Sequence, residues 1–331
     1  MRIKHRRLIP TIILTALIAG PLLACQVPVF RYALERWQSD QFELVVIHDG
    51  ELSTEANEQI QQLRESNYES ILAANFNLRT VPAGKLKDRR LLQSWGNRSN
   101  KEEPMLVAMY PTGAKEVPDR ICWAGSLLDN SVKHIPDSPV RKQISEILVE
   151  GASAVWIFVP SGNKEQDDAA LKTLKEEVRQ NEKTLELPVQ DEIESEDDLI
   201  QVSGLELKIT FSIVTVRRDD PKEQFLLSML LNSEPDLADL NEPMAFPAIG
   251  RGRVLYGLIG KGINSQTIGA ASRFLVGPCS CQVKNQNPGF DLLLAKDWDM
   301  KLFGKKAMPQ SPESAKDAAP VLLAIPPGKK K

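Results

Sequence analysis

Cysteine and histidine are the residues of this chain whose chemistry is easiest to place, because 331 residues include only four cysteines and three histidines. Cys279 and Cys281 are separated by a single serine, whereas Cys25 and Cys122 stand apart from them. Two cysteines at this spacing can form a strained disulfide, which is easily reduced. Two sulfur atoms lack the third and fourth ligands that zinc requires, so the spacing favours a disulfide over a metal site.

Cys25 ends a segment with the features of a secretory signal. Residues 1–7 contain four lysines and arginines and no acid, and residues 8–24 form an apolar run that two prolines and a glycine interrupt. This pattern is typical of a signal peptide and unfavourable for a membrane-spanning helix. The sequence Leu-Leu-Ala-Cys at residues 22–25 resembles the lipobox of bacterial lipoproteins. The resemblance implies that residues 1–24 are removed and that the Cys25 sulfur receives a diacylglycerol. Ordinary signal cleavage and an uncleaved anchor are the alternatives.

The other three cysteines cannot all pair within one chain, although thiols outside the cytoplasm tend to pair. We therefore expect one disulfide and one buried thiol. The disulfide joins Cys122 to Cys279 or Cys281 and so connects two parts of the chain, or it joins Cys279 to Cys281. A redox pair formed by Cys279 and Cys281 and a metal site remain alternatives.

The histidines and the glycine-rich segments show no pattern of a catalytic or cofactor site. No Gly-x-Ser-x-Gly motif accompanies His48 or His134. His48 ends an apolar segment beside Asp49, and we interpret a hydrogen bond between them as structural. Residues 250–253 (Gly-Arg-Gly-Arg) and 260–262 (Gly-Lys-Gly) lack the phosphate-loop pattern and predict a hairpin turn and a helix lead-in. We predict no catalytic residue, no cofactor and no metal ligand.

The charge is distributed unevenly along the chain. Removal of residues 1–24 takes away four basic and no acidic residues, so the net charge falls from −3 to −7. The tail from Lys305 has six lysines against two acids, which leaves the rest at −11. Such an acidic body argues against a nucleic-acid partner. Residues 182–204 hold eight acids and one lysine, and we predict a solvated insertion there; loose calcium binding stays open, although the segment lacks an EF-hand loop.

Hydrophobic patterning predicts two halves with the same order of elements: strand, helix, strand, helix, two hairpin strands and helix. The first strands fall at residues 42–48 and 155–159. The hairpins open with Glu-Pro-Met at residues 103–105 and again at residues 242–244. A repeat of this length indicates a duplicated domain. The expected units are the signal peptide 1–24, a first α/β domain 25–152, a second α/β domain 153–304 with the acidic insertion 182–204, and a disordered tail 305–331.

The same order resembles the core of the thioredoxin fold over residues 42–152 and 153–277. In that fold a cis proline begins the first strand of the final hairpin, so the resemblance implies cis peptide bonds before Pro104 and Pro243. It also implies two mixed sheets with flanking helices. The redox Cys-x-x-Cys of that family follows the first strand, and residues 48–51 and 160–163 contain no cysteine. The resemblance therefore implies the fold without its thiol chemistry.

These observations together predict a lipid-anchored protein on the extracytoplasmic, periplasmic face of a bacterial membrane, inner or outer. We expect a non-catalytic binding or scaffolding role in the cell envelope. The expected partners are the membrane, through the lipid on Cys25, and an envelope protein that the sequence does not identify. A thiol-disulfide redox protein that uses Cys279 and Cys281 is the second hypothesis.

Overall fold

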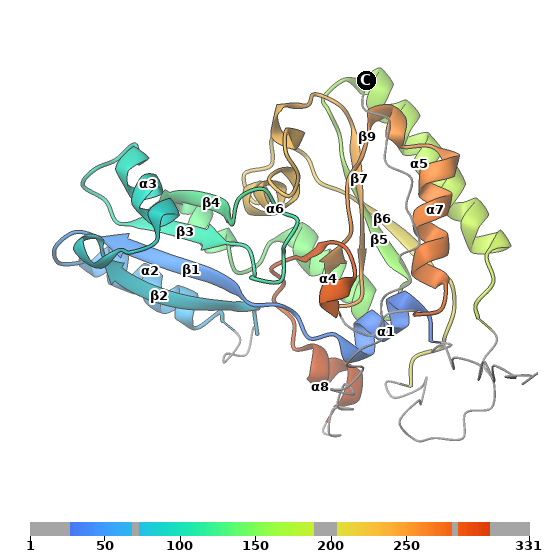
Figure 1. Ribbon diagram of the computed structural model, residues 1–331, viewed down its shortest axis with the longest axis horizontal. Coiled ribbons are helices and arrows are strands. Elements are labelled where there is room, and N and C mark those ends of the chain that lie inside the picture. The colour runs from blue at the N-terminus through green and yellow to red at the C-terminus, as the bar shows by residue number, and fades with distance from the viewer. Residues whose placement is uncertain (1–26, 68–72, 189–203, 280–283, 305–331) are drawn as a thin grey trace, which may run out of the picture.

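Two separate mixed β-sheets, each with helices on its faces, make up the described part of the chain (Figure 1). The computed structural model describes residues 27–67, 73–188, 204–279 and 284–304. The α/β class and the two mixed sheets are confirmed. Cys25, Cys281, most of the acidic insertion and the tail lie outside the described residues.

The first sheet has the strand order β2-β1-β3-β4. Its central strand β1 runs parallel to β2 and antiparallel to β3, and β4 is antiparallel to β3. The apolar run of β1 is buried on both faces because α2 covers one face of the sheet and α3 the other. The strands are β1 (Phe42–His48), β2 (Phe76–Pro82), β3 (Met105–Met109) and β4 (Ile121–Ser126).

The second sheet repeats this arrangement at its core. Its strand order is β10-β8-β7-β5-β6, and β9 pairs with β7. The central strand β5 is parallel to β6 and antiparallel to β7, as β1 is to β2 and β3. The repeated order of elements in the sequence thus corresponds to a repeated strand order. The strands are β5 (Ala154–Val159), β6 (Phe211–Thr215), β7 (Met244–Ile249), β8 (Arg253–Val254), β9 (Leu258–Ile259) and β10 (Phe290–Asp291).

Polar residues at the N-termini start the helices where the sequence supplies a cap. Ser53 accepts a hydrogen bond from the Ala56 N–H at 3.1 Å, and Asp88 accepts one from Arg90 at 2.8 Å. The helices are α1 (Val29–Arg36), α2 (Thr54–Arg64), α3 (Arg89–Asn97), α4 (Pro139–Val149), α5 (Lys164–Thr184), α6 (Gln224–Leu231), α7 (Ser265–Val276) and α8 (Trp298–Phe303). Short 3₁₀ turns are η1 (Ala83–Lys85), η2 (Asn130–His134), η4 (Leu237–Asp239), η5 (Gly260–Gly262) and η6 (Lys284–Gln286).

The helix α4 lies on the second sheet, although the order of elements predicted that it would close the first. Its buried Ile144 and Leu148 share one apolar cluster with Val155 and Ile157 of β5. Helices α1, α5 and α7 cover the opposite face of the second sheet. An amphipathic pattern shows that a helix has an apolar face but does not show which sheet that face covers. The two halves therefore share a core.

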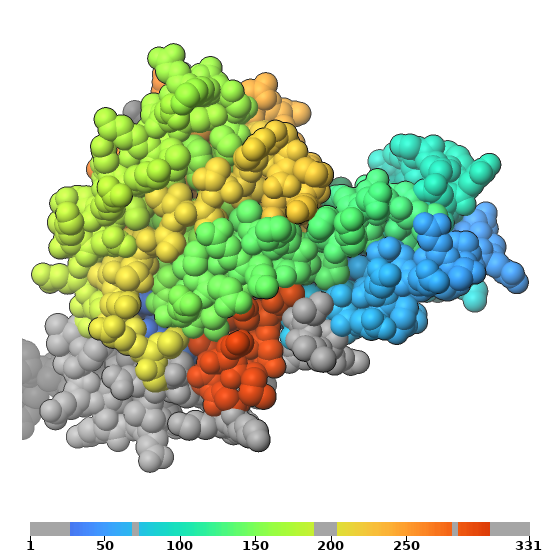
Figure 2. Space-filling model, turned by 180° about the vertical axis from the view of Figure 1, so that it is seen from behind, coloured from blue at the N-terminus to red at the C-terminus, as the bar shows by residue number. Residues whose placement is uncertain are grey.

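A buried polar cluster joins the halves where α4 begins. The carboxylate of Glu223, 1% exposed, accepts hydrogen bonds from Ser138 Oγ at 2.6 Å and from the Val140 N–H at 2.8 Å. The fully buried Arg141 donates to the carbonyls of Ile135 at 2.8 Å and Leu293 at 3.0 Å. The first sheet and its helices project from this junction as a lobe (Figure 2). The helix α8 contacts α4 at the junction.

The prediction of cis peptide bonds at Pro104 and Pro243 is wrong, since no peptide bond of the described residues is cis. Both prolines are trans, and the carbonyl of each accepts a hydrogen bond at an equivalent place in its hairpin. The Pro104 carbonyl accepts a hydrogen bond from Leu127 at 2.9 Å, and the Pro243 carbonyl accepts one from Gly260 at 2.8 Å. Each bond closes the hairpin that the proline opens.

Candidate functional site

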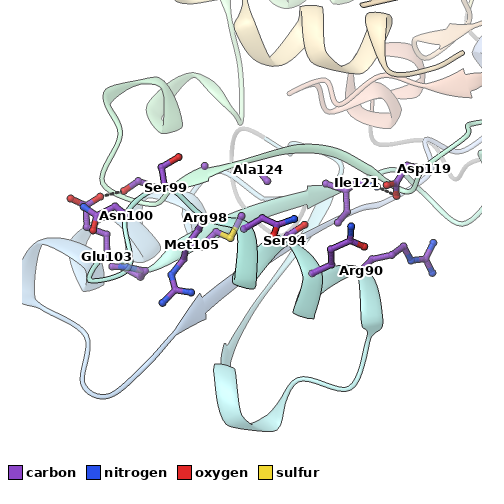
Figure 3. A pocket seen from close by; sticks show the side chains of 15 residues that line it. Arg90, Ser94, Arg98, Ser99, Asn100, Glu103, Met105, Asp119, Ile121 and Ala124 are labelled. Carbon is purple, nitrogen blue, oxygen red and sulfur yellow. Dashed lines mark hydrogen bonds between the residues drawn. The ribbon is translucent and has the colours of Figure 1, made fainter. Parts of the chain in front are cut away.

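A groove of about 470 Å³ lies between α3 and the hairpin of β3 and β4 (Figure 3). Asp88 caps α3, and the buried Leu91 packs that helix onto Val45 and Val107 of the sheet. This packing directs other side chains of α3 to the groove. They are Arg90, Gln93, Ser94 and Asn97.

The floor of the groove is formed by small or apolar residues of the hairpin. Met105 and Ile121 supply apolar surface, and the exposed Ala124 leaves space above β4. Leu127 donates to Pro104, so alternate residues of β4 bond to β3 and Ala124 does not. The backbone N–H and C=O of Ala124 therefore point to the outer edge of the sheet.

Hydrogen bonds within the rim hold the loop after α3 in place. Arg98 stacks on the Trp95 ring at 3.3 Å and donates to the carbonyls of Trp95 at 2.5 Å and Lys101 at 2.8 Å. Ser126 donates to the Glu103 carboxylate. The groove thus presents amide, hydroxyl, guanidinium and carboxylate groups. Its described lining residues include no cysteine or histidine.

The predicted disulfide from Cys122 to Cys279 is not formed. Cys122 is a free thiol in the apolar core that the two halves share. Its Sγ donates to the Ala108 carbonyl at 3.3 Å. Cys279 is buried in the cluster under α1 and α7, on the far face of the second sheet. Burial raises the pKa of the Cys122 thiol, which makes it unreactive. A bridge between Cys279 and Cys281 stays a prediction, because Cys281 lies outside the described residues.

The structure does not bring the two histidines together. His48 Nδ1 donates to the Gly50 carbonyl at 2.8 Å rather than to Asp49. The carbonyl of His134 accepts a hydrogen bond from Arg141, and burial followed by the charge of Lys133 lowers the pKa of its imidazole. Among the described residues, no group of His, Cys, Asp and Glu side chains could hold a metal ion.

The position after β5, where the thioredoxin family has its cysteines, is closed by the chain's own side chains. The Asp167 carboxylate accepts hydrogen bonds from the N–H groups of Ser161 at 2.7 Å and Gly162 at 2.9 Å. The side chain of Asn163 caps α5. These carboxylate and amide oxygens thus accept from four backbone N–H groups at the start of the helix, where an anion would otherwise bind.

Residues 250–253 form the expected turn between β7 and β8, but the burial of its two arginines was not predicted from the sequence. Arg251 donates to the Leu34 carbonyl at 2.9 Å and lies 2.7 Å from Asp299, so it connects α1 to α8. Arg253 pairs with Asp291 at 3.3 Å. Both arginines are buried, although exposed charge is the usual expectation for a hairpin turn. Gly250 lets the turn approach Ala33 of α1, and Gly252 lets it approach Leu294.

A second charged cluster surrounds Asp40, whose backbone N–H donates to Asp291 at 2.8 Å. Burial and the nearby Asp291 carboxylate raise the pKa of Asp40, whereas Lys284, 2.9 Å away, opposes the shift. As the pH rises from about 4, the unfolded chain releases this proton before the folded protein does. The folded state is therefore progressively destabilised until the pH passes the raised pKa.

Asp40→Asn cannot titrate, so its stability relative to the wild-type protein is expected to increase between about pH 4 and about pH 7. Urea unfolding at both pH values measures the change. Asp129→Asn is the control without a pH trend in this range, because a hydrogen bond from Ser131 lowers the pKa of Asp129 and the group is ionised in both states over most of the range. A relative stability of Asp40→Asn that decreases over this range would contradict the assignment.

Comparisons with protein-family models, curated proteins and solved structures gave no match for this chain. Within the described ranges, no helix has both the length and the apolar character needed to cross a membrane. The interpretation of the groove and of the 250–253 turn therefore depends on their geometry alone.

Proposed function

We propose that the mature chain is a bacterial lipoprotein with a non-catalytic binding or scaffolding role in the cell envelope. Cys25 carries a diacylglycerol, and the body is on the extracytoplasmic side of the membrane. The signal-like residues 1–24 and the Leu-Leu-Ala-Cys sequence support this proposal. Two or three acyl chains provide stable attachment where one chain is marginal.

The groove beside α3 supports the binding role and is the observation that carries it. Amides of Gln93 and Asn97 and the hydroxyl of Ser94 can hydrogen-bond a peptide backbone, and Ala124 offers a backbone donor and acceptor at the sheet edge. We infer that the partner is an envelope protein that places an extended segment in this groove.

A photo-crosslinking residue at Ala124 tests the groove. Incorporated at this position, it is expected to give a cross-linked species in intact cell envelopes. The matched control is the same residue at Glu58, which is exposed on α2. Cross-linking that is equal at the two positions, or absent at Ala124, would contradict the binding role of the groove.

We also propose that both halves are thioredoxin-like. The shared strand order and the equivalent hairpin bonds of Pro104 and Pro243 support this identity. The trans prolines count against it. The proposal implies no thiol chemistry, because neither 48–51 nor 160–163 contains a cysteine.

The second candidate function is thiol-disulfide exchange by Cys279 and Cys281. Their spacing favours it, and the burial of Cys279, which is 2% exposed, counts against it because exchange requires an accessible sulfur. A redox protein would reduce or oxidise a dithiol substrate and lose this activity in Cys281→Ser. The binding protein proposed here has no such activity to lose.

Metabolic labelling with a clickable fatty acid tests the lipid. The wild-type protein is expected to take up the label, and Cys25→Ser is expected to lose it completely because the acceptor sulfur is gone. Cys281→Ser removes a cysteine elsewhere and should keep the label. Labelling of Cys25→Ser at the wild-type level would refute the lipid at this residue.

A further inference from the structure

We propose that the end of the folded body formed by Val27, Pro28 and the C-terminal part of α7 lies directly on the lipid bilayer. This inference rests on the proposed lipid at Cys25. It adds that no spacer separates the lipid from the folded body. Only Gln26 stands between Cys25 and the first residue of the fold.

The chain is fixed to the body from Val27 onward. The Val27 carbonyl accepts a hydrogen bond from Cys279 at 2.9 Å, and the Val29 N–H donates to Gly277 at 3.0 Å. Pro28 and Pro278 face each other in an antiparallel bridge. Two residues span about 7 Å at most, so the lipid holds this end of the body within that distance of the membrane.

The helix α1 that follows is part of the core and cannot act as a stalk. Phe30, Ala33 and Leu34 are each at most 2% exposed. The Arg251 contacts to Leu34 and Asp299 attach α1 to the rest of the body. The chain therefore has no hinge between Val27 and Arg36 that could lift the body from the bilayer.

Three side chains at this end suit an interface between water and lipid, although the acidic insertion begins close by, since Asn181 of α5 donates to Ser272 of α7 at 3.2 Å. Pro278 is exposed, Phe274 is half-buried at the edge of the apolar cluster, and Arg273 is exposed in the last turn of α7. The Phe274 ring and the Arg273 cation lie at the same end of α7. They match the headgroup region of a bilayer, where aromatic and basic residues lie together. The helix α3 with the groove lies at the far end of the first sheet (Figure 1), so the groove stays open to a partner in the aqueous space.

Depth-dependent quenching tests the contact. A small fluorescent amino acid is placed at Arg273 or, as the remote control, at Leu92, an exposed residue of α3. The full-length lipidated protein is reconstituted into phosphatidylglycerol–phosphatidylethanolamine vesicles that carry a headgroup quencher. We expect at least twofold stronger quenching at Arg273 than at Leu92.

A flexible insert of twelve Gly and Ser residues between Gln26 and Val27 completes the test. It leaves the lipid in place and is expected to reduce the quenching at Arg273 to the level at Leu92. Equal quenching at both positions in the wild-type protein would overturn the inference, as would an insert without effect. The failure of the lipid proposal is separate, because the protein would then lack acyl mass on Cys25 and would not join the vesicles.

Discussion

Replacing Glu223 with alanine is expected to lower the free energy of unfolding by about 3–5 kcal/mol, the range for removing one partner from a buried charged cluster. The carboxylate accepts from Ser138 and Val140, and its charge acts on the Arg141 guanidinium. Burial lowers the pKa of Arg141 to about 10, which shows that its charge is costly to keep. The substitution leaves that buried cation without this carboxylate and the Val140 N–H, in the first turn of α4, without its acceptor.

Urea denaturation measures the loss. Glu223→Gln keeps an acceptor oxygen and is expected to lose less than Glu223→Ala. Glu58→Ala, on the exposed face of α2, should change the stability by at most about 0.5 kcal/mol. A loss of less than about 1 kcal/mol for Glu223→Ala would show that the cluster does not hold the halves together.

Gly250→Ala is expected to destabilise the protein by roughly 2–4 kcal/mol, from an unfavourable backbone angle and a clash. Gly250 has φ of +56°, and a Cβ there would lie 2.6 Å from the Ala33 Cβ and 2.8 Å from its carbonyl carbon. Because the obstacle includes the backbone of α1, the helix itself must move. The substitution therefore displaces the segment that follows Cys25.

Gly162→Ala is the matched control. Gly162 has φ of +96°, and a Cβ there would meet no atom within 4 Å. Its replacement carries the backbone cost alone, about 1 kcal/mol. The difference between the two variants in thermal or urea unfolding isolates the contact with α1, and equal losses would contradict the close packing of the turn on that helix.

The elements that depend on local pattern could be predicted from the sequence. The apolar runs of β1 and β5 and the repeated Glu-Pro-Met placed the central strands and both hairpins correctly. A pattern of this kind reports which face of an element is apolar. It does not report what covers that face, and for this reason the position of α4 on the second sheet was missed.

The candidate site was harder to predict because its residues carry no pattern. Gln93, Ser94 and Asn97 are ordinary surface residues until α3 packs over the hairpin and forms the groove. The turn that contains Arg251 and Arg253 was predicted, but the burial of these arginines was not, since buried charges are rare and depend on distant partners such as Asp299 and Asp291. The number of cysteines also led to the wrong prediction of a disulfide between Cys122 and Cys279, because these residues lie in different apolar clusters.

The mass of the N-terminal peptide of protein extracted from membranes tests the central claim most directly. We expect a mature chain that begins at Cys25 and carries the mass of a diacylglycerol on that residue, with or without a further acyl chain on its amino group. A peptide that begins elsewhere, or an unmodified Cys25 in membrane-bound protein, would contradict it.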